Sequence, residues 1–181
     1  MMVEVSERSF EKTIECALLR FGTDACEKET AGIREEPASY GEFPAGGFRK
    51  RPPEEYDAGL CLLPRDAIDF VLATQPKEWD KLKQHHGAAV KGQFLRRLSR
   101  EIERRGALDV LRNGLKDSGC KFQLAYFRPS SGLNEALQRL HAANLFTVVR
   151  QLHYSEKTAQ RLDLELFLNG VPVFTTALNH P

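Results

Sequence analysis

The fold of this chain is decided by residues 161–178, which read RLDLELFLNGVPVFTTAL. Leucines occupy every second position from Leu162 to Leu168 and alternate with Asp163, Glu165 and Phe167. This period of two predicts a β-strand. The Asn-Gly dipeptide at positions 169 and 170 is the strongest short signal for a two-residue hairpin turn. The apolar residues that follow therefore predict a second, antiparallel strand.

Upstream of this hairpin, the pattern of strands extends back to about residue 121. We expect strands over KFQLAYF (121–127) and LFTVVRQLHY (145–154), with a helix over LNEALQRLHAA (133–143) between them. Residues 60–116 have helical periodicity instead. Pro64 and Pro76 suit first helical turns, while Gly106 and Gly114 interrupt the pattern.

The opening of the chain predicts one amphipathic helix over residues 9–21. Its apolar positions share a face, which leaves the wetter side to three glutamates, Glu7, Glu11 and Glu15. The apolar positions are Phe10, Ile14, Ala17, Leu18 and Phe21. Residues 23–57 lose this periodicity and predict an irregular insertion. With 181 residues, the chain is expected to form a single domain, 1–181, of mixed α/β (α+β) class, with a sheet region over 121–179.

The charge of the whole chain hides a local excess. Lys and Arg number 26 against 25 Asp and Glu, but residues 91–116 hold eight basic and three acidic residues. Five arginines of this segment share the outer side of one helix, and we call them the basic band: Arg96, Arg97, Arg100, Arg104 and Arg105. Such a band can bind phosphates, or it can be a solvated face neutralised by Glu101 and Glu103.

Several function classes lack their motifs. No CxxC pair occurs among the four cysteines (Cys16, Cys26, Cys61 and Cys120), which argues against a zinc knuckle or thioredoxin motif and predicts reduced thiols. The adjacent His85 and His86 point apart and do not suggest a metal site. Neither a phosphate loop nor a serine-nucleophile motif is present. The absence of a basic leader and of a long apolar run predicts a cytoplasmic protein without a membrane partner.

Acidic residues on the strand 161–168 allow two interpretations. Asp163 and Glu165 are hard oxygen donors of the kind that bind Mg²⁺, which can activate water for phosphodiester cleavage. The alternative is that this side of an antiparallel sheet is solvated, which is the commoner case.

Several strings resemble one known family, namely TQPKEW, GCKFQLAYF, RQLHYSEK and LDLELFLNGVPVFTTAL. They are similar to the N-terminal nuclease domain of the restriction (motor-nuclease) subunit of type I restriction-modification enzymes. The resemblance runs in order over roughly residues 56–181 and includes the opening helix FEKTIECALL. It implies a restriction-endonuclease-like core, with a small mixed sheet flanked by helices, that cleaves double-stranded DNA with a divalent metal.

Within that family, cleavage depends on an Asp on one strand and a Glu-x-Lys on the next. The resemblance assigns the Asp, a catalytic residue and Mg²⁺ ligand, to Asp163, while the Glu and Lys positions hold Ala177 and Asn179. A further acid of the opening helix falls on Glu11 or Glu15, and Glu15 is preferred. We therefore expect weakened Mg²⁺ binding and impaired cleavage, because no cation replaces the lysine. Glu165 offers a second carboxylate for the same metal but supplies no positive charge.

The hairpin register provides a geometric check on this assignment. A strict two-residue turn pairs Leu168 with Val171 and puts Ala177 and Asn179 on the leucine face, opposite Asp163. The family arrangement therefore requires a β-bulge or a connection of odd length. Pro172, which cannot donate a hydrogen bond to the ladder, is a suitable place for a bulge.

The resemblance also implies partners. These are double-stranded DNA and the modification and specificity subunits of a type I complex, with the basic band contacting DNA or a neighbouring subunit. ATP is bound by motor lobes that follow this region in the family, so this segment is not expected to bind ATP, and its sheet is expected to be incomplete at the C-terminus. The alternative is a non-catalytic DNA-binding or complex-docking module, or a decayed remnant, of the same system.

Overall fold

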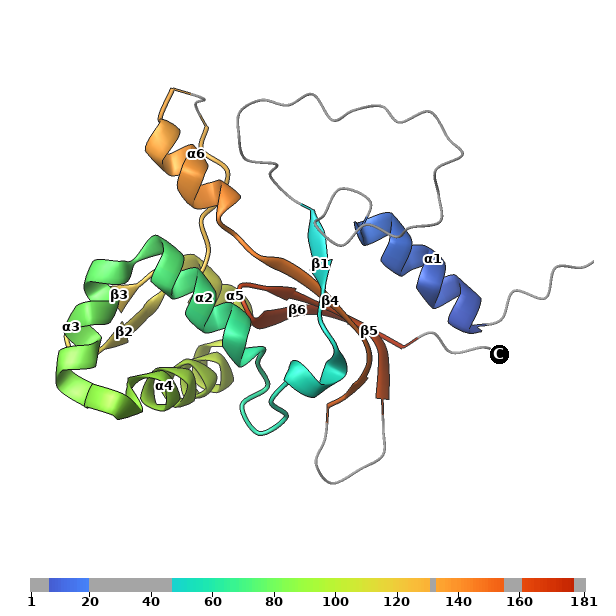
Figure 1. Cartoon of the computed structure of the whole chain (residues 1–181), viewed down its shortest axis with the longest axis horizontal. Coiled ribbons are helices and arrows are strands. Elements are labelled where there is room, and N and C mark those ends of the chain that lie inside the picture. Colours follow the sequence, from blue (N-terminus) through green and yellow to red (C-terminus); the bar gives the residue numbers. More distant parts are fainter. Residues whose placement is uncertain (1–6, 20–46, 131–132, 155–160, 178–181) are drawn as a thin grey trace, which may run out of the picture.

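The computed structural model describes residues 7–19, 47–130, 133–154 and 161–177. These residues form a mixed α/β fold with two sheets (Figure 1). The helices are α1 (Glu7–Leu19), α2 (Pro64–Thr74), α3 (Pro76–His86), α4 (Val90–Arg105), α5 (Ala107–Asn113) and α6 (Glu135–Ala142), with 3-10 turns η1 (Pro53–Glu55) and η2 (Gly87–Ala89). The strands are β1 (Phe48–Lys50), β2 (Leu115–Asp117), β3 (Cys120–Phe122), β4 (Phe146–His153), β5 (Arg161–Leu168) and β6 (Val171–Thr176).

The larger sheet has the strand order β1-β4-β5-β6. β1 is parallel to β4, while the β4–β5 and β5–β6 pairs are antiparallel. β2 and β3 form a separate two-stranded hairpin. The predicted fold class, a small mixed sheet with helices, is confirmed at this level.

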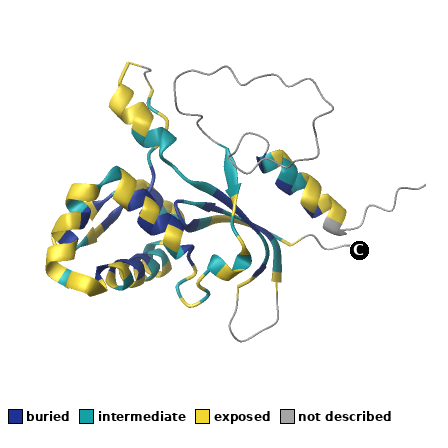
Figure 2. Ribbon diagram, in the orientation of Figure 1, coloured by how far each residue is buried: buried dark blue, intermediate teal, exposed yellow. Residues whose placement is uncertain are grey.

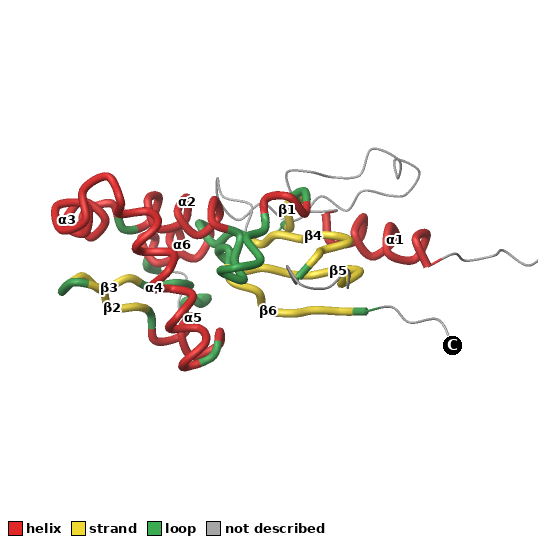
Figure 3. The backbone as a smooth tube through the Cα atoms, turned by 90° about the horizontal axis from the view of Figure 1, so that it is seen from below, coloured by secondary structure: helices red, strands yellow, loops and turns green. Residues whose placement is uncertain are grey.

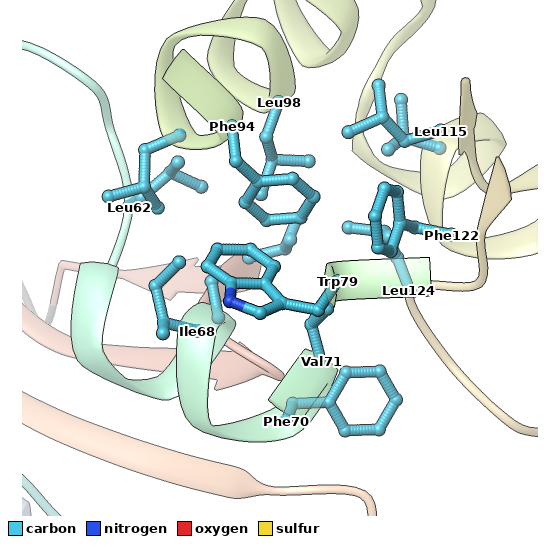
Figure 4. Close-up of a cluster of buried hydrophobic side chains, with 14 of the residues drawn as sticks. Leu62, Ile68, Phe70, Val71, Trp79, Phe94, Leu98, Leu115, Phe122 and Leu124 are labelled. Carbon is cyan, nitrogen blue, oxygen red and sulfur yellow. The ribbon is translucent and has the colours of Figure 1, made fainter. Parts of the chain in front are cut away.

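Helices α2 to α5 pack with the β2–β3 hairpin into a helical lobe that holds the largest apolar core (Figure 4). Trp79 of α3, Phe94 of α4 and Phe122 of β3 meet edge to face, with ring centroids 5.5 and 5.2 Å apart. As predicted, Pro64 and Pro76 occupy first helical turns. Glycines with positive φ end both α4 and α5, as expected for residues that tolerate the left-handed region.

The sheet has an apolar cluster on each face. On one face, Ile14, Leu18 and Leu19 of α1 pack against Val148 and Leu164. On the other, Leu63 and Tyr56 pack against the sheet residues Val149, Leu152 and Phe167. Figures 1 and 3, at right angles to each other, both put α1 at one end of the molecule and the helical lobe at the other.

The β5–β6 turn is the predicted Asn-Gly hairpin, and it is buried. Asn169 and Gly170 both have positive φ, 52° and 79°, as a type I′ turn requires. Both polar atoms of the Asn169 side chain are hydrogen-bonded. Oδ1 accepts a hydrogen bond from the Leu145 amide (2.7 Å), and Nδ2 donates to Leu124 O (2.8 Å) and to Asn144 Oδ1 (3.0 Å). The turn therefore locks the sheet onto the helical lobe.

A β-bulge follows immediately after this turn. Leu168 pairs with Val171 and Phe167 with Pro172, but Leu166 pairs with Phe174, so Val173 is the extra residue. From there the register continues as Glu165 with Thr175 and Leu164 with Thr176. The bulge lies next to Pro172, where the sequence predicts it.

Two segments differ from their predictions. The irregular insertion, 23–57, contains β1 and η1 at its end, while its residues 23–46 lie outside the described residues. In the predicted strand 121–127 only the first two residues belong to β3. Gln75 accounts for the end of this strand, because its side-chain amide pairs with the backbone of Gln123 in place of a neighbouring strand.

The orientation of α1 is also different from the prediction. Glu11 and Glu15, predicted on the wetter side, are 1% and 3% exposed, whereas Phe10 is 48% exposed. The physical reason is that both carboxylates have cationic partners on the sheet, so they can be buried (described below). Phe21 lies outside the described residues.

Helix α6 projects from the body and contains no buried residue (Figures 1 and 2). Its N-cap residue Asn134 accepts a hydrogen bond from the Leu137 amide at 3.1 Å, which satisfies one free donor of the first turn. No helix of the described residues has both the length and the apolar character needed to cross a membrane.

The prediction of reduced cysteines is wrong for Cys16. This α1 residue is disulfide-bonded, to a partner outside the described residues, whereas Cys61 and Cys120 are free.

Candidate functional site

Polar side chains from four elements meet where α1 crosses the sheet, and we call them the acid–base cluster. α1 contributes two carboxylates, β5 contributes one, and the neighbouring strands contribute two cations and an amide. The members are Glu11, Glu15, Lys50, Arg150, Gln151 and Asp163. The structure thus brings together two of the predicted site residues, Glu15 and Asp163, although they are far apart in the sequence.

Arg150 of β4 is the centre of the cluster. Its Nη2 lies 2.9 Å from Glu11 Oε2 and its Nη1 lies 3.0 Å from Glu15 Oε2. Glu11 and Glu15 are four residues apart and therefore one above the other on α1, so a single planar guanidinium can reach both. Lys50 of β1 completes the pairing, with Nζ 2.9 Å from Glu15 Oε1.

The guanidinium of Arg150 is itself partly buried. Burial lowers its pKa, but hydrogen bonds to Glu11 and Glu15 outweigh that effect and raise the pKa above its ordinary value. Arg150 therefore keeps its positive charge beside the two carboxylates.

Gln151 connects Asp163 to the α1 carboxylates. Its Nε2 donates to Glu11 Oε1 at 2.9 Å and to Asp163 Oδ1 at 3.4 Å. Gln151 has a φ of 53°, which is rare for a residue other than glycine, and the β4–β5 ladder skips the position where it faces Asp163. This local interruption is how a strand residue directs its side chain toward α1, and strained backbone of this kind is concentrated at functional sites.

Ala177 directly follows the last residue of β6, Thr176, which pairs with Leu164. Continued by one residue beyond this last pair, the bulged register would set Ala177 opposite Asp163. Without the bulge, Thr176 would hold that place. Ala177 is exposed, and Asn179 lies outside the described residues.

Glu165 does not share the surroundings of Asp163. It is 3% exposed, so the prediction that this position is solvated is wrong for Glu165. It lies near Tyr56 on the opposite face from α1, and its Oε2 has no hydrogen-bond partner among the described residues. Burial raises its pKa to about 7. Because it faces away from the acid–base cluster, Glu165 cannot take over as a ligand beside Asp163.

The fit of a Mg²⁺ ion to these residues depends on whether their carboxylates are available. Glu11, Glu15 and Asp163 are hard oxygen donors, as Mg²⁺ prefers. However, Arg150 and Lys50 already neutralise the two glutamates, and the described residues contain no group of three or more His, Cys, Asp or Glu side chains arranged to hold a metal. As arranged, these side chains do not fit Mg²⁺, and binding at Asp163 stays a prediction of the resemblance.

The basic band on α4 is largely engaged in ion pairs. Glu101 is 4% exposed and forms three ion pairs. Its carboxylate oxygens lie 3.2 Å from Arg97 Nη2, 2.7 Å from Arg104 Nη2 and 3.3 Å from Arg105 Nη1. Hydrogen bonds from Arg104 and Arg105 hold the pKa of Glu101 below its ordinary value. The arginines Arg96 and Arg100 are exposed, and neither has an ion pair with a described residue. Three of the five arginines therefore fit the interpretation of the basic band as a solvated helix face that acidic residues partly neutralise.

The basic band and the acid–base cluster are at different ends of the molecule. α4 belongs to the helical lobe, whereas the cluster joins α1 to the larger sheet. Figures 1 and 3 show α4 and α1 at opposite ends of the molecule. One site that combines the band with Asp163 is therefore not formed.

His86 lies beside the β2–β3 hairpin, and its sequence context does not suggest a metal site. Its Nε2 is 3.2 Å from Ser118 Oγ and 3.8 Å from Asp117. Ser118 also donates to Asp117, at 3.0 Å, so the carboxylate does not orient the imidazole as it does in a catalytic triad. A shallow pocket of about 320 Å³ is lined by residues 116–121 of this hairpin, in the helical lobe.

A scan against protein-family models and searches of curated proteins and of solved structures find no match for this chain.

Three members of the cluster, Lys50, Arg150 and Gln151, are not among the residues predicted from the sequence. Lys50 is in a segment without hydrophobic periodicity. Gln151 has a positive φ, which no sequence motif predicts at this position. Arg150 carries a usable signal, because a charged residue inside the apolar run LFTVVRQL needs a partner when the strand is buried.

Proposed function

We propose that this chain is a restriction-endonuclease-like nuclease domain of a type I restriction subunit, and that its cleavage of double-stranded DNA is impaired. The resemblance supplies the reaction class, and the geometry of β5, β6 and α1 supports it. The DNA target would be read by a separate specificity subunit, as the family implies.

The register of the β5–β6 hairpin carries this proposal. The family pattern needs its strand Asp and the Glu position of the next strand on one side of the sheet, which a plain Asn-Gly hairpin prevents. The extra residue Val173 shifts the register by one, so that its continuation past the last pair, Leu164 with Thr176, would set Ala177 opposite Asp163. Bulges often re-aim side chains next to active sites, although they also occur on edge strands such as β6.

The position of Glu15 gives independent support. The resemblance assigns an acid of the opening helix to the catalytic centre, and Glu15 is linked to Asp163 through Arg150, Glu11 and Gln151. The contacts join segments more than 130 residues apart, as a catalytic centre built from several elements requires.

The impairment follows from residue types. A methyl group at Ala177 cannot bind a cation, and an amide at Asn179 cannot replace the charge of a lysine beside the scissile phosphate. Loss of one such stabilising group costs about 100- to 1,000-fold in rate.

Supercoiled-plasmid nicking with Mg²⁺ or Mn²⁺ tests the proposal. Wild-type protein is expected to leave the plasmid intact, and the double variant Ala177→Glu/Asn179→Lys is expected to nick it at least about 100-fold faster. Rapid nicking by the wild type that is lost in Asp163→Ala would contradict the impairment. No gain in the double variant would contradict the assignment of the catalytic positions.

The basic band favours a second candidate function, a non-catalytic DNA-binding or docking module. Arg96 and Arg100 are exposed on α4, at the end of the molecule away from Asp163. Contacts made there do not need the catalytic centre. A module of this kind binds DNA, or a subunit of the complex, equally well in the wild type and in the Asp163→Ala variant.

A further inference from the structure

Two buried carboxylates on successive turns of α1 face the same cation. Glu11 and Glu15 are 1% and 3% exposed, and their oxygens are bound by Arg150, Lys50 and Gln151. Two anionic groups this close are strongly unfavourable in a buried position unless positive charge lies between them.

The charges within this part of the cluster cancel. Glu11 and Glu15 carry two negative charges, and Arg150 and Lys50 carry two positive charges. Two positive charges are also what one divalent cation would provide to the same pair of carboxylates.

The guanidinium also has the geometry for this task. Its two terminal nitrogens each reach one carboxylate, at 2.9 and 3.0 Å, so a planar fork bridges the two acids as a metal ion would. Lys50, whose side chain is 51% exposed, lies 2.9 Å from the second oxygen of Glu15, Oε1.

We infer that Arg150 and Lys50 supply to the α1 carboxylates the two charges that a divalent cation would otherwise supply, so that the cluster fastens α1 to the sheet without metal. This goes beyond the proposed function and does not depend on DNA cleavage. It also gives the misfit of Mg²⁺ a physical cause: a metal ion reaches Glu11 and Glu15 only by displacing Arg150.

Thermal unfolding of the full chain in chelator and in millimolar Mn²⁺ tests this inference. The melting temperature of the wild type is expected to be the same in both. The variant Arg150→Met keeps the length of the side chain but leaves two buried carboxylates facing each other. It is expected to melt about 10 °C lower in chelator and to recover several degrees in Mn²⁺.

Arg51→Met is the matched control. Arg51 is about as buried as Arg150, with side chains 16% and 22% exposed, and it pairs with the buried Asp66. Asp66 keeps Arg49 and Thr147 as partners, and no second buried carboxylate of the described residues faces it. This variant is expected to melt lower than the wild type but to show no response to Mn²⁺.

Two results would overturn the inference. One is a wild-type melting temperature that rises in Mn²⁺ as much as that of Arg150→Met. The other is an Arg150→Met variant that melts like the wild type in chelator. If Arg150→Met does not fold, Lys50→Met, with a half-exposed side chain, tests the same balance of charge and is expected to melt lower than the wild type in chelator, because Glu15 loses one of its two cations. A melting temperature equal to that of the wild type would overturn the inference. Because the readout is melting, failure here leaves the nicking assay as a separate test.

Discussion

At the scale of single residues, Asp163 and Glu165 of β5 lie two positions apart and have opposite surroundings. Asp163 is linked through Gln151 to the α1 acids, whereas Glu165 lies in an apolar cluster near Tyr56. The interruption of the ladder at Gln151 separates them. Two carboxylates at alternate positions of one strand therefore lie in different environments.

Glu165 predicts a pH dependence of stability. Its pKa is raised from an ordinary 4.5 to about 7 by burial, so the folded protein holds a proton that the unfolded chain releases. The free energy of unfolding should therefore fall as pH rises from about 4.5 to about 7, by at most about 3 kcal/mol, and then level off. Urea unfolding at several pH values measures this decline. Glu165→Gln, which is neutral at every pH, should abolish it, and an unchanged slope in that variant would contradict the assignment.

At the scale of elements, the β5–β6 turn connects the sheet to the helical lobe. The Gly170 carbonyl accepts a hydrogen bond from Leu63, and a Cβ at Gly170 would lie 2.5 Å from Leu63 O and 2.7 Å from Ala67 N. Both of those atoms belong to the backbone at the start of α2, which cannot move without displacing the helix.

Gly170→Ala is therefore expected to destabilise the protein by about 3 kcal/mol or more, since it combines a positive φ with a backbone clash. Gly119→Ala is the matched control, because Gly119 has a φ of 80° and open space around its Cβ position. It should cost only about 1 kcal/mol. Chemical denaturation of both variants measures the difference, and equal losses would show that the turn is not packed as described.

For the basic band, we predict different effects for substitution of its unpaired arginines and of the arginines paired with Glu101. All four of Arg96, Arg97, Arg100 and Arg104 are exposed, but only Arg97 and Arg104 are paired with the buried Glu101. If the band binds DNA, Arg100→Ala should weaken binding and reduce the slope of log affinity against log salt by about 0.9. Arg97→Ala should affect stability more than DNA affinity. Fluorescence anisotropy at several salt concentrations measures both, and a slope unchanged in Arg100→Ala would assign the band to another role.

At the scale of the whole molecule, the parts that could be predicted from sequence are those set by local chemistry. Pro64 and Pro76 mark first helical turns, and the Asn-Gly turn follows from backbone geometry, whereas the bulge beside Pro172 is expected only from the family resemblance. The orientation of α1 could not be predicted, because its buried face includes Glu11 and Glu15 beside Leu19, and burial of these acids depends on Arg150, 135 residues from Glu15. The same long-range pairing explains why the acid–base cluster as a whole could not be predicted: the resemblance points to Asp163 and to Glu11 or Glu15, and Arg150 stands out as a charge in an apolar run, but Lys50 and Gln151 have no sequence signal.

The whole fold also separates the regions to which the two proposed activities are assigned. The Asp163 side of the sheet lies under α1, and the basic band lies on the helical lobe at the other end (Figure 1). Cleavage and binding through the band should therefore respond to different substitutions.

The most direct measurement is plasmid nicking by the restored variant Ala177→Glu/Asn179→Lys with one further change. If positions 163 and 177 form one catalytic centre, adding Asp163→Ala should abolish the gained activity, whereas adding Glu165→Gln should leave it within about threefold of the restored variant, since rate losses of about 100-fold belong to groups at the reacting centre. Restored nicking that survives Asp163→Ala, or that is lost with Glu165→Gln in a folded protein, would contradict the account.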